Sequence, residues 1–126
     1  MDYDLLVAQV TALLADESDF IANAANFAAF VYNEIPDLNW GRGVCGAAFM
    51  LGTTVVVDDV HAFADHIACD SASASEIVVP LRAGNTITGV FDIDSPRIAR
   101  FSAQDRAGIE RLVQAFLKSS ERELMQ

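Results

Sequence analysis

The stretch that decides the fold reads Glu76-Ile-Val-Val-Pro-Leu-Arg-Ala-Gly-Asn-Thr-Ile-Thr-Gly-Val-Phe-Asp-Ile-Asp94. Its two halves are rich in β-branched and aromatic residues, which are typical of strands. The residues between them, Arg82-Ala-Gly-Asn85, are typical of a tight turn. We therefore predict two antiparallel strands, over residues 76–81 and 86–94, joined as a hairpin.

Helical patterns lie on both sides of this hairpin. Residues 5–14 are apolar-rich without a helix breaker, and residues 20–32 repeat apolar side chains at spacings of three and four. Residues 109–117 carry the same kind of stripe, and Ser102 with Asp105 resembles a capping box just before it. The sequence thus predicts three long helices.

The segment between the second helix and the hairpin mixes several patterns. Residues 53–57 are β-branched and predict a buried strand, whereas residues 43–50 fit a short helix. Residues 58–75 form a long irregular segment. The resulting order of elements predicts an α+β fold, in which helices pack on one side of a mostly antiparallel sheet.

Length and composition indicate a single domain over residues 1–126, long enough to bury one core. The chain contains no apolar run of membrane-spanning length and no basic signal-peptide region, so we expect a cytoplasmic protein with reduced thiols. Its net charge of −10 disfavours nucleic acid and anionic membranes as partners.

Cys69 is the main candidate for chemistry. It stands in a run of small polar residues just before the hairpin, and His66 lies three positions earlier. A thiolate is the reactive form of cysteine, and a nearby cation or backbone N–H group stabilises it. This spacing is only weakly specific, so an inert, half-buried thiol is an equal alternative.

Three carboxylates lie on or beside the hairpin strands. Asp92 and Asp94 are two positions apart and therefore share one face, while Glu76 begins the other strand. Adjacent carboxylates repel unless a cation or a shared proton lies between them, which raises the pKa of one carboxyl. Such groups can protonate a leaving oxygen or hold an ammonium group. The alternative is a solvated strand face with ordinary surface acids.

A mixed zinc site is a further candidate, with His61, His66, Cys69 and Cys45 as ligands. The spacing of the first three is not that of a zinc finger, and the chain has no second pair of cysteines. We therefore expect neither a metal nor another cofactor.

Four motifs stand out as unbroken runs: Gly41-Arg-Gly-Val-Cys-Gly46, Asp65-His-Ile-Ala-Cys-Asp-Ser-Ala-Ser73, Ser75-Glu-Ile-Val-Val-Pro-Leu81 and Gly89-Val-Phe-Asp-Ile-Asp-Ser-Pro96. Together they resemble the GAF-domain free methionine-(R)-sulfoxide reductases, over roughly residues 15–105. The motif around Cys69 is highly specific, because GAF domains in general do not share it.

The resemblance implies a GAF-like fold and a role for each matched residue. Cys69 matches the nucleophile of the family, and Cys45 matches a second cysteine. Trp40 matches an aromatic wall around the substrate methyl group. Glu76, Asp92 and Asp94 match the carboxylates that bind the amino acid and act on the sulfoxide oxygen.

The resemblance also implies an antioxidant oxidoreductase mechanism. The Cys69 thiolate attacks the sulfoxide sulfur, methionine leaves, and a cysteine sulfenic acid remains. A second thiol condenses with it to form a disulfide, which a thioredoxin-type reductant opens.

The chain departs from the family at one place, since Trp40 is joined directly to Gly41. Family members have a strand, a turn and a second strand there, together with the resolving cysteine. We therefore expect a sheet short of two strands, with an exposed edge that favours exchange with another chain and a homodimer. The alternative to an enzyme of impaired activity is a GAF module that only binds a small molecule.

Overall fold

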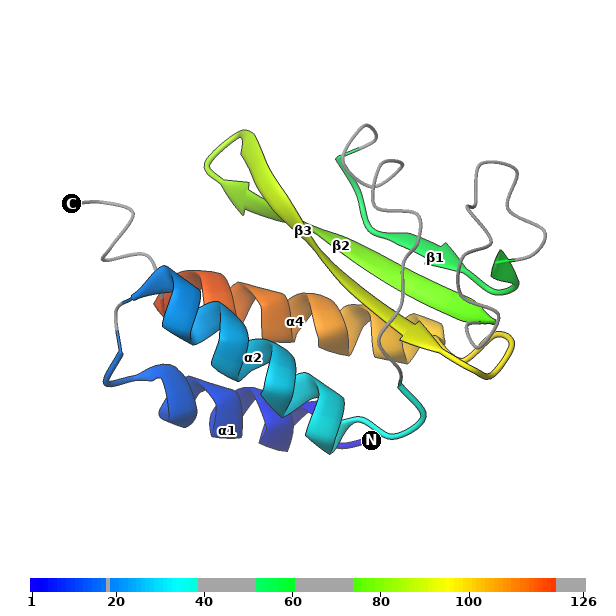
Figure 1. Ribbon diagram of the computed structural model, residues 1–126, viewed down its shortest axis with the longest axis horizontal. Coiled ribbons are helices and arrows are strands. Elements are labelled where there is room, and N and C mark those ends of the chain that lie inside the picture. The colour runs from blue at the N-terminus through cyan, green and yellow to red at the C-terminus, as the bar shows by residue number, and fades with distance from the viewer. Residues whose placement is uncertain (18, 39–51, 61–73, 120–126) are drawn as a thin grey trace. The chain divides into compact units, whose positions relative to one another are not determined.

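The computed structural model describes residues 1–17, 19–38, 52–60 and 74–119. Along the chain these form helices α1 (Tyr3–Leu14) and α2 (Phe20–Glu34), strands β1 (Val55–Val57), β2 (Ser75–Ala83) and β3 (Thr86–Ser95), and helix α4 (Ala103–Ser119) (Figure 1). The predicted α+β class is confirmed. The chain divides into two compact units, a helical one of Met1–Pro36 with Ala107–Gln126 and a sheet-containing one of Asp37–Arg106.

An aspartate caps each of the first two helices. Asp2 precedes α1, and its carboxylate accepts a hydrogen bond of 3.0 Å from the Leu5 N–H. Asp19 precedes α2 and accepts one of 3.2 Å from the Ile21 N–H. Such caps satisfy N–H groups that have no partner inside the helix. Both predicted helices are confirmed, each slightly longer than predicted.

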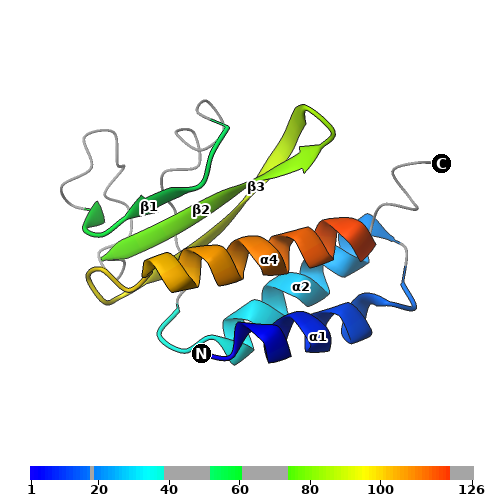
Figure 2. The ribbon, with the colours of Figure 1, turned by 180° about the vertical axis from the view of Figure 1, so that it is seen from behind.

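The core of the helical unit is built from the apolar stripes of α1, α2 and α4, which run side by side within it (Figure 2). The rings of Phe27 and Phe116 stack with their centroids 4.9 Å apart. Gly108 on α4 lies against Tyr3, and an added Cβ would come within 2.2 Å of the tyrosine ring. This close approach of α1 and α4 therefore requires glycine.

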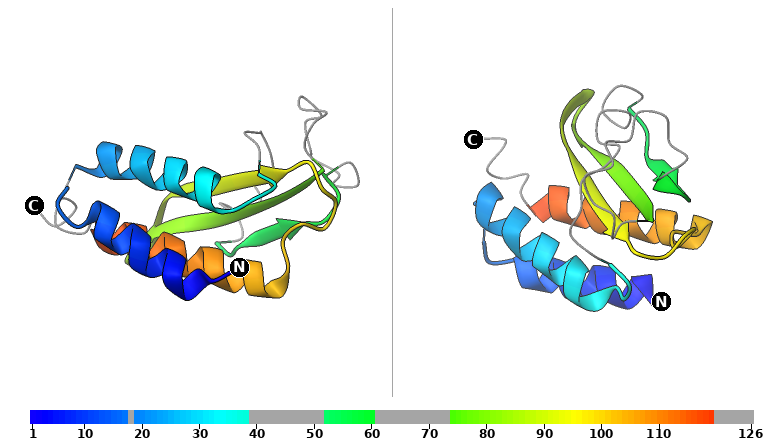
Figure 3. Two further views of the ribbon diagram at one scale, coloured as in Figure 1. Left: turned by 90° about the horizontal axis from the view of Figure 1, so that it is seen from below. Right: turned by 45° about the vertical axis from the view of Figure 1, so that its right-hand side comes forward.

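The sheet is antiparallel with the strand order β1-β2-β3 (Figure 3). The register pairs Val57 with Glu76 on β2, and Glu76 with Asp94 on β3. Gly84 and Asn85 form the turn between β2 and β3. The φ angle of Gly84 is 63°, which glycine adopts without strain, and the predicted hairpin is confirmed.

The strand predicted over residues 53–57 is shorter than expected, since only Val55–Val57 is a strand. Val55 pairs with Val78, so the same register would place Thr53 opposite Pro80. Proline has no N–H to donate to a ladder, which accounts for the early end of the pairing.

The capping box before α4 is confirmed. The Ser102 N–H donates to the Asp105 carboxylate at 3.0 Å, and the Asp105 N–H donates to the Ser102 hydroxyl at 3.1 Å. The short helix predicted over residues 43–50 and most of the irregular segment 58–75 lie outside the described residues. Within the described ranges, every helix is too short or too polar to cross a membrane.

Candidate functional site

Glu76, Asp92 and Asp94 come together on one face of the hairpin. Glu76 lies directly opposite Asp94, and Asp92 lies opposite Val78. Because side chains alternate along a strand, the three carboxylates point to the same face. An oxygen atom of each lies within 4.8 Å of the others.

Apolar side chains lie next to this carboxylate cluster, since Val57 pairs with Glu76 and Val78 pairs with Asp92. They belong to a hydrophobic cluster of buried and partly buried valines, namely Val55, Val57, Val60, Val78 and Val90. Glu76 is 0% exposed and Asp94 is 1% exposed, while Asp92 is half-buried. The alternative that Glu76 and Asp94 are ordinary surface acids is therefore wrong.

The electrostatics of the carboxylate cluster favour a cation or a proton. Three negative charges this close together repel one another, and burial disfavours each ionised form as well. An ammonium group would neutralise part of this charge, and so would a metal ion with a preference for oxygen ligands. A carboxyl that keeps its proton would relieve the repulsion in another way, and it could act as a general acid.

The sequence alone indicates no role for two serines that lie next to the carboxylates. Ser75 pairs with Ser95 across β2 and β3, one position beyond the pair of Glu76 and Asp94. Both serines are 0% exposed. The only signal in the sequence is that a serine adjoins an acid in both motifs, and small polar residues are too common for this to point to a role.

The remaining predicted site residues lie outside the described parts of the chain. They are Trp40, Cys45 and Cys69, together with the zinc candidates His61 and His66. Their roles therefore stay predictions, and the carboxylate cluster is the part of the predicted site for which the structure gives a geometry.

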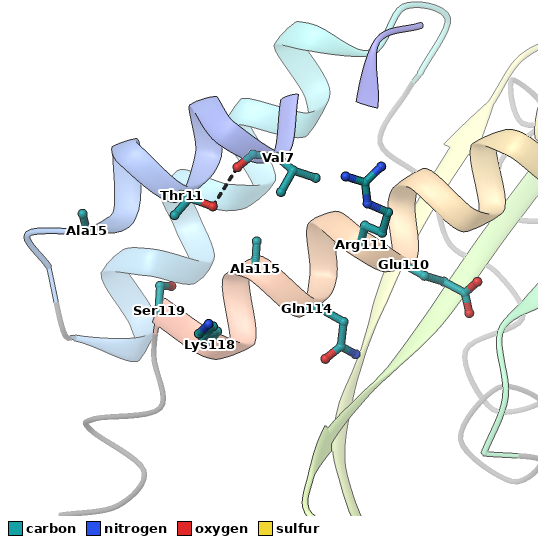
Figure 4. A pocket seen from close by; sticks show the side chains of 9 residues that line it. All are labelled: Val7, Thr11, Ala15, Glu110, Arg111, Gln114, Ala115, Lys118 and Ser119. Atoms are coloured by element: carbon teal, nitrogen blue, oxygen red, sulfur yellow. Dashed lines mark hydrogen bonds between the residues drawn. The ribbon is translucent and has the colours of Figure 1, made fainter. Parts of the chain in front are cut away.

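A separate groove lies in the helical unit, between α1 and α4 (Figure 4). Its volume is about 610 Å³, and Val7, Thr11 and Ala115 are among the residues that line it. Arg111, also in its lining, forms an ion pair of 2.8 Å with Asp4. None of the three clustered carboxylates lines this groove, so it has no direct part in their chemistry.

Comparisons with known proteins identify the family. Residues 4–116 match the GAF domain. The free methionine-R-sulfoxide reductase of Escherichia coli is 40% identical, and the match covers 81% of this chain and 78% of that protein. The chain belongs to the GAF-domain free methionine-R-sulfoxide reductase family. Another relative in the comparison, Protein YtsP of Bacillus subtilis, is 39% identical over 99% of this chain and 92% of its own length.

Solved structures of this GAF-domain family have the same fold. The reduced form of fRMsr from Staphylococcus aureus matches with a TM-score of 0.89 and 35% identity, covering 94% of this chain and 95% of that one. Free methionine-R-sulfoxide reductase from Neisseria meningitidis, in complex with its substrate, matches with a TM-score of 0.84 and 36% identity, covering 94% and 88%. The GAF-like fold expected from the motifs is confirmed.

The match to the Bacillus subtilis relative also bears on the expected gap. It extends over 154 positions, 28 more than the 126 residues of this chain. At least that many positions of the relative therefore have no counterpart here. This agrees with an internal segment that relatives have and this chain lacks.

Proposed function

We propose that this chain reduces free L-methionine-(R)-sulfoxide to methionine, with thiols as the source of electrons. The proposal depends on one observation in a chain of this family: buried Glu76 and Asp94 lie close to half-buried Asp92. A free amino acid has an ammonium group, which a methionine inside a protein lacks. A buried group of acids therefore suits the free amino acid better than a protein-bound residue.

We assign two tasks to the carboxylate cluster. Its ionised members bind the substrate ammonium group, and a protonated member donates to the sulfoxide oxygen as the bond to sulfur breaks. Glu76 and Asp94 are fully buried, so one of this pair is better suited to keep a proton than half-buried Asp92. Asp92 is then the more suitable partner for the ammonium group.

The redox step is assigned to Cys69. Its thiolate attacks the sulfoxide sulfur, the sulfur–oxygen bond breaks, and the products are methionine and a sulfenic acid on Cys69. The Cys45 thiol then condenses with the sulfenic acid, which releases water and leaves a disulfide. A thioredoxin-type dithiol reduces this disulfide by exchange and is itself oxidised, which returns both cysteines to the thiol form.

A second candidate function is binding without catalysis. The Bacillus subtilis relative has positions without a counterpart in this chain. Loss of catalysis is favoured if these positions include the strands and the cysteine expected between Trp40 and Gly41. Such a chain would keep the carboxylate cluster and bind methionine or its sulfoxide, but Cys69 would not pass through catalytic cycles.

The decisive experiment incubates the purified protein with free methionine-(R)-sulfoxide and dithiothreitol and measures methionine. Multiple turnovers that Cys69→Ser abolishes support the reductase. The variant Cys45→Ser tests the disulfide step, because it should slow turnover only if Cys45 resolves the sulfenic acid. Binding of the sulfoxide without turnover would favour the second candidate, and full turnover by Cys69→Ser would contradict the mechanism.

We further propose that the protein acts as a homodimer in the cytoplasm. Large apolar side chains are exposed on α1 and α2, among them Leu5 at 52%, Leu13 at 51% and Ile21 at 72%. Apolar surface of this kind is often covered by another chain. Light scattering of the protein as it elutes from a size-exclusion column measures its mass in solution. A monomer at micromolar concentration would contradict this proposal.

A further inference from the structure

The buried pair of the carboxylate cluster lies next to one end of the β2–β3 ladder. Glu76 is the second residue of β2, and Asp94 is the last but one of β3. The end of a ladder opens more readily than its middle, because fewer neighbouring contacts hold it. Repulsion among the clustered carboxylates favours the same opening. A contact that holds this end of the ladder closed therefore bears directly on the pair.

The Ser75 hydroxyl provides such a contact. It donates a hydrogen bond of 2.5 Å to the Arg97 carbonyl and accepts one of 3.3 Å from the Arg100 N–H. Both partners lie in the turn that follows β3, residues 96–100. The Ser95 hydroxyl, at the end of β3, accepts a further hydrogen bond of 3.1 Å from the Arg97 N–H. The turn thus joins the first residue of β2 to the last residue of β3.

The same turn also reaches the third strand. The Ala99 N–H donates a hydrogen bond of 2.8 Å to the Asp58 carbonyl. Asp58 directly follows Val57, the β1 residue that pairs with Glu76. Ala99 has a φ of 54°, in the left-handed region that non-glycine residues avoid, and such a conformation persists only where its surroundings enforce it. The turn is therefore held in one conformation at the end of all three strands.

An ion pair that is largely buried holds the far end of the turn. The Arg100 guanidinium lies 3.1 Å from the Asp105 carboxylate, and the two side chains are only 11% and 13% exposed. Asp105 also accepts a hydrogen bond of 3.0 Å from the Ser102 N–H in the capping box of α4. The turn to which Ser75 binds is thus anchored at the start of α4, and it can hold the start of β2 in turn.

The hydrogen bonds of Ser75 are shielded from water. Ser75 and Ser95 are both 0% exposed. When a buried hydroxyl is removed, its former partners have no water to bind instead, so the loss is larger than at the surface. The two serines lie on the face of the hairpin opposite to the carboxylates, because side chains alternate along a strand. Ser75 therefore acts on the carboxylates through the backbone and not by contact.

We propose that Ser75 is a positioning residue for the Glu76–Asp94 pair. Its hydroxyl holds the end of the ladder closed, which keeps the two carboxyl groups close together and buried. Such surroundings favour a carboxyl group that retains its proton. The inference rests on the proposed function, in which this proton is donated to the sulfoxide oxygen.

The register predicts which kinetic constant depends on Ser75. Asp92, to which we assign the ammonium group of the substrate, lies opposite Val78, two positions further inside the ladder. Opening at the end of the ladder should therefore disturb the proton donor more than the ammonium site. Loss of the Ser75 hydroxyl should lower kcat and leave KM nearly unchanged.

The kinetic test compares Ser75→Ala with a matched control on the same hairpin. Thr88 also donates a side-chain hydrogen bond to a backbone carbonyl, that of Leu81, at 3.3 Å, but near the hairpin turn. With free methionine-(R)-sulfoxide and dithiothreitol, we expect Ser75→Ala to lower kcat about tenfold, a part of what a general acid contributes. Its KM should change little, and Thr88→Ala should leave both constants unchanged.

Hydrogen exchange measures the opening of the ladder without any turnover. Mass spectrometry follows the exchange of backbone amides in peptides that contain Glu76 or Asp94. We expect this exchange to be about tenfold faster in Ser75→Ala, and Thr88→Ala should affect only peptides near the hairpin turn. Thermal unfolding shows whether each variant is folded at the assay temperature. If Ser75→Ala is not folded, Ser95→Ala replaces it, because this variant loses the hydrogen bond to Arg97 of the same turn.

The two proposals fail in different ways. If the wild type forms no methionine, the proposed function is wrong, while hydrogen exchange still decides whether Ser75 holds the Glu76–Asp94 pair. If the wild type turns over and the folded Ser75→Ala variant keeps its kcat, the positioning role is overturned. A rise in KM at constant kcat, or an equal loss of kcat in Thr88→Ala, would also overturn it.

Discussion

The two ends of the β2–β3 hairpin share one ladder but lie in opposite environments. At the turn end Arg82, Gly84 and Asn85 are exposed to solvent. At the other end Glu76 and Asp94 are exposed by no more than 1%. Charged side chains are ordinary at the first end and costly at the second. This difference is the reason why we propose that the chemistry takes place at the buried end, and each prediction below tests it.

The largest effect is expected from neutralising a buried acid. Glu76→Gln and Asp94→Asn keep the shape of the side chain but remove the charge and the transferable proton. We expect each to lower kcat/KM at least about 100-fold, or about 2.7 kcal/mol of transition-state stabilisation. The assay with free methionine-(R)-sulfoxide and dithiothreitol measures this. The matched control is Asp58→Asn, which changes an exposed acid next to β1. An equal loss of kcat/KM in this variant would show that the buried acids have no special role.

The next effect concerns packing around the carboxylates. Val78 is 0% exposed and packs with Val57 and Val60. We expect Val78→Ala to lower the free energy of unfolding by about 2 kcal/mol, since it leaves a cavity. Thr86→Ala, beside the exposed turn, should change it by less than about 0.5 kcal/mol. Urea unfolding measures both, and similar values would show that the two ends are equally well packed.

A smaller effect of opposite sign is expected for the stability of Glu76→Gln. Removing the Glu76 charge relieves repulsion with buried Asp94 and half-buried Asp92, so the free energy of unfolding without substrate should rise by about 1 kcal/mol. The same variant is expected to lose activity, and together the results would show that the cluster trades stability for function. A clear loss of stability would instead indicate that the Glu76 charge is compensated in the free protein.

The smallest effect is expected for an exposed ion pair of the turn that follows β3, residues 96–100. The side chains of Arg97 and Asp37 are 64% and 43% exposed, so their ion pair is largely solvated. A double-mutant cycle with Arg97→Ala and Asp37→Ala should give a coupling energy below about 0.5 kcal/mol. The Ser75 hydroxyl, which donates to the Arg97 carbonyl and accepts from the Arg100 N–H, should contribute more to the stability of the same turn. A coupling energy above about 1 kcal/mol would reverse this order.

Local patterns predicted the elements of the fold well where the residues themselves carry the signal. The hairpin follows from β-branched runs around a glycine-containing turn, and the helix starts follow from capping residues such as Ser102. The end of β1 could not be predicted, because it depends on which β2 residue lies opposite. The register placed Pro80 there, and a single strand contains no information about its partner.

The sequence by itself determined the family and the order of the described helices and strands, because motif spacing and alternation are properties of the chain alone. It also placed Asp92 and Asp94 on one face. Only the tertiary structure decided that Glu76 joins them, since that requires the register between β2 and β3. The burial of Glu76 and Asp94, and the hydrogen bonds from Ser75 to Arg97 and Arg100, also arise only when distant segments meet.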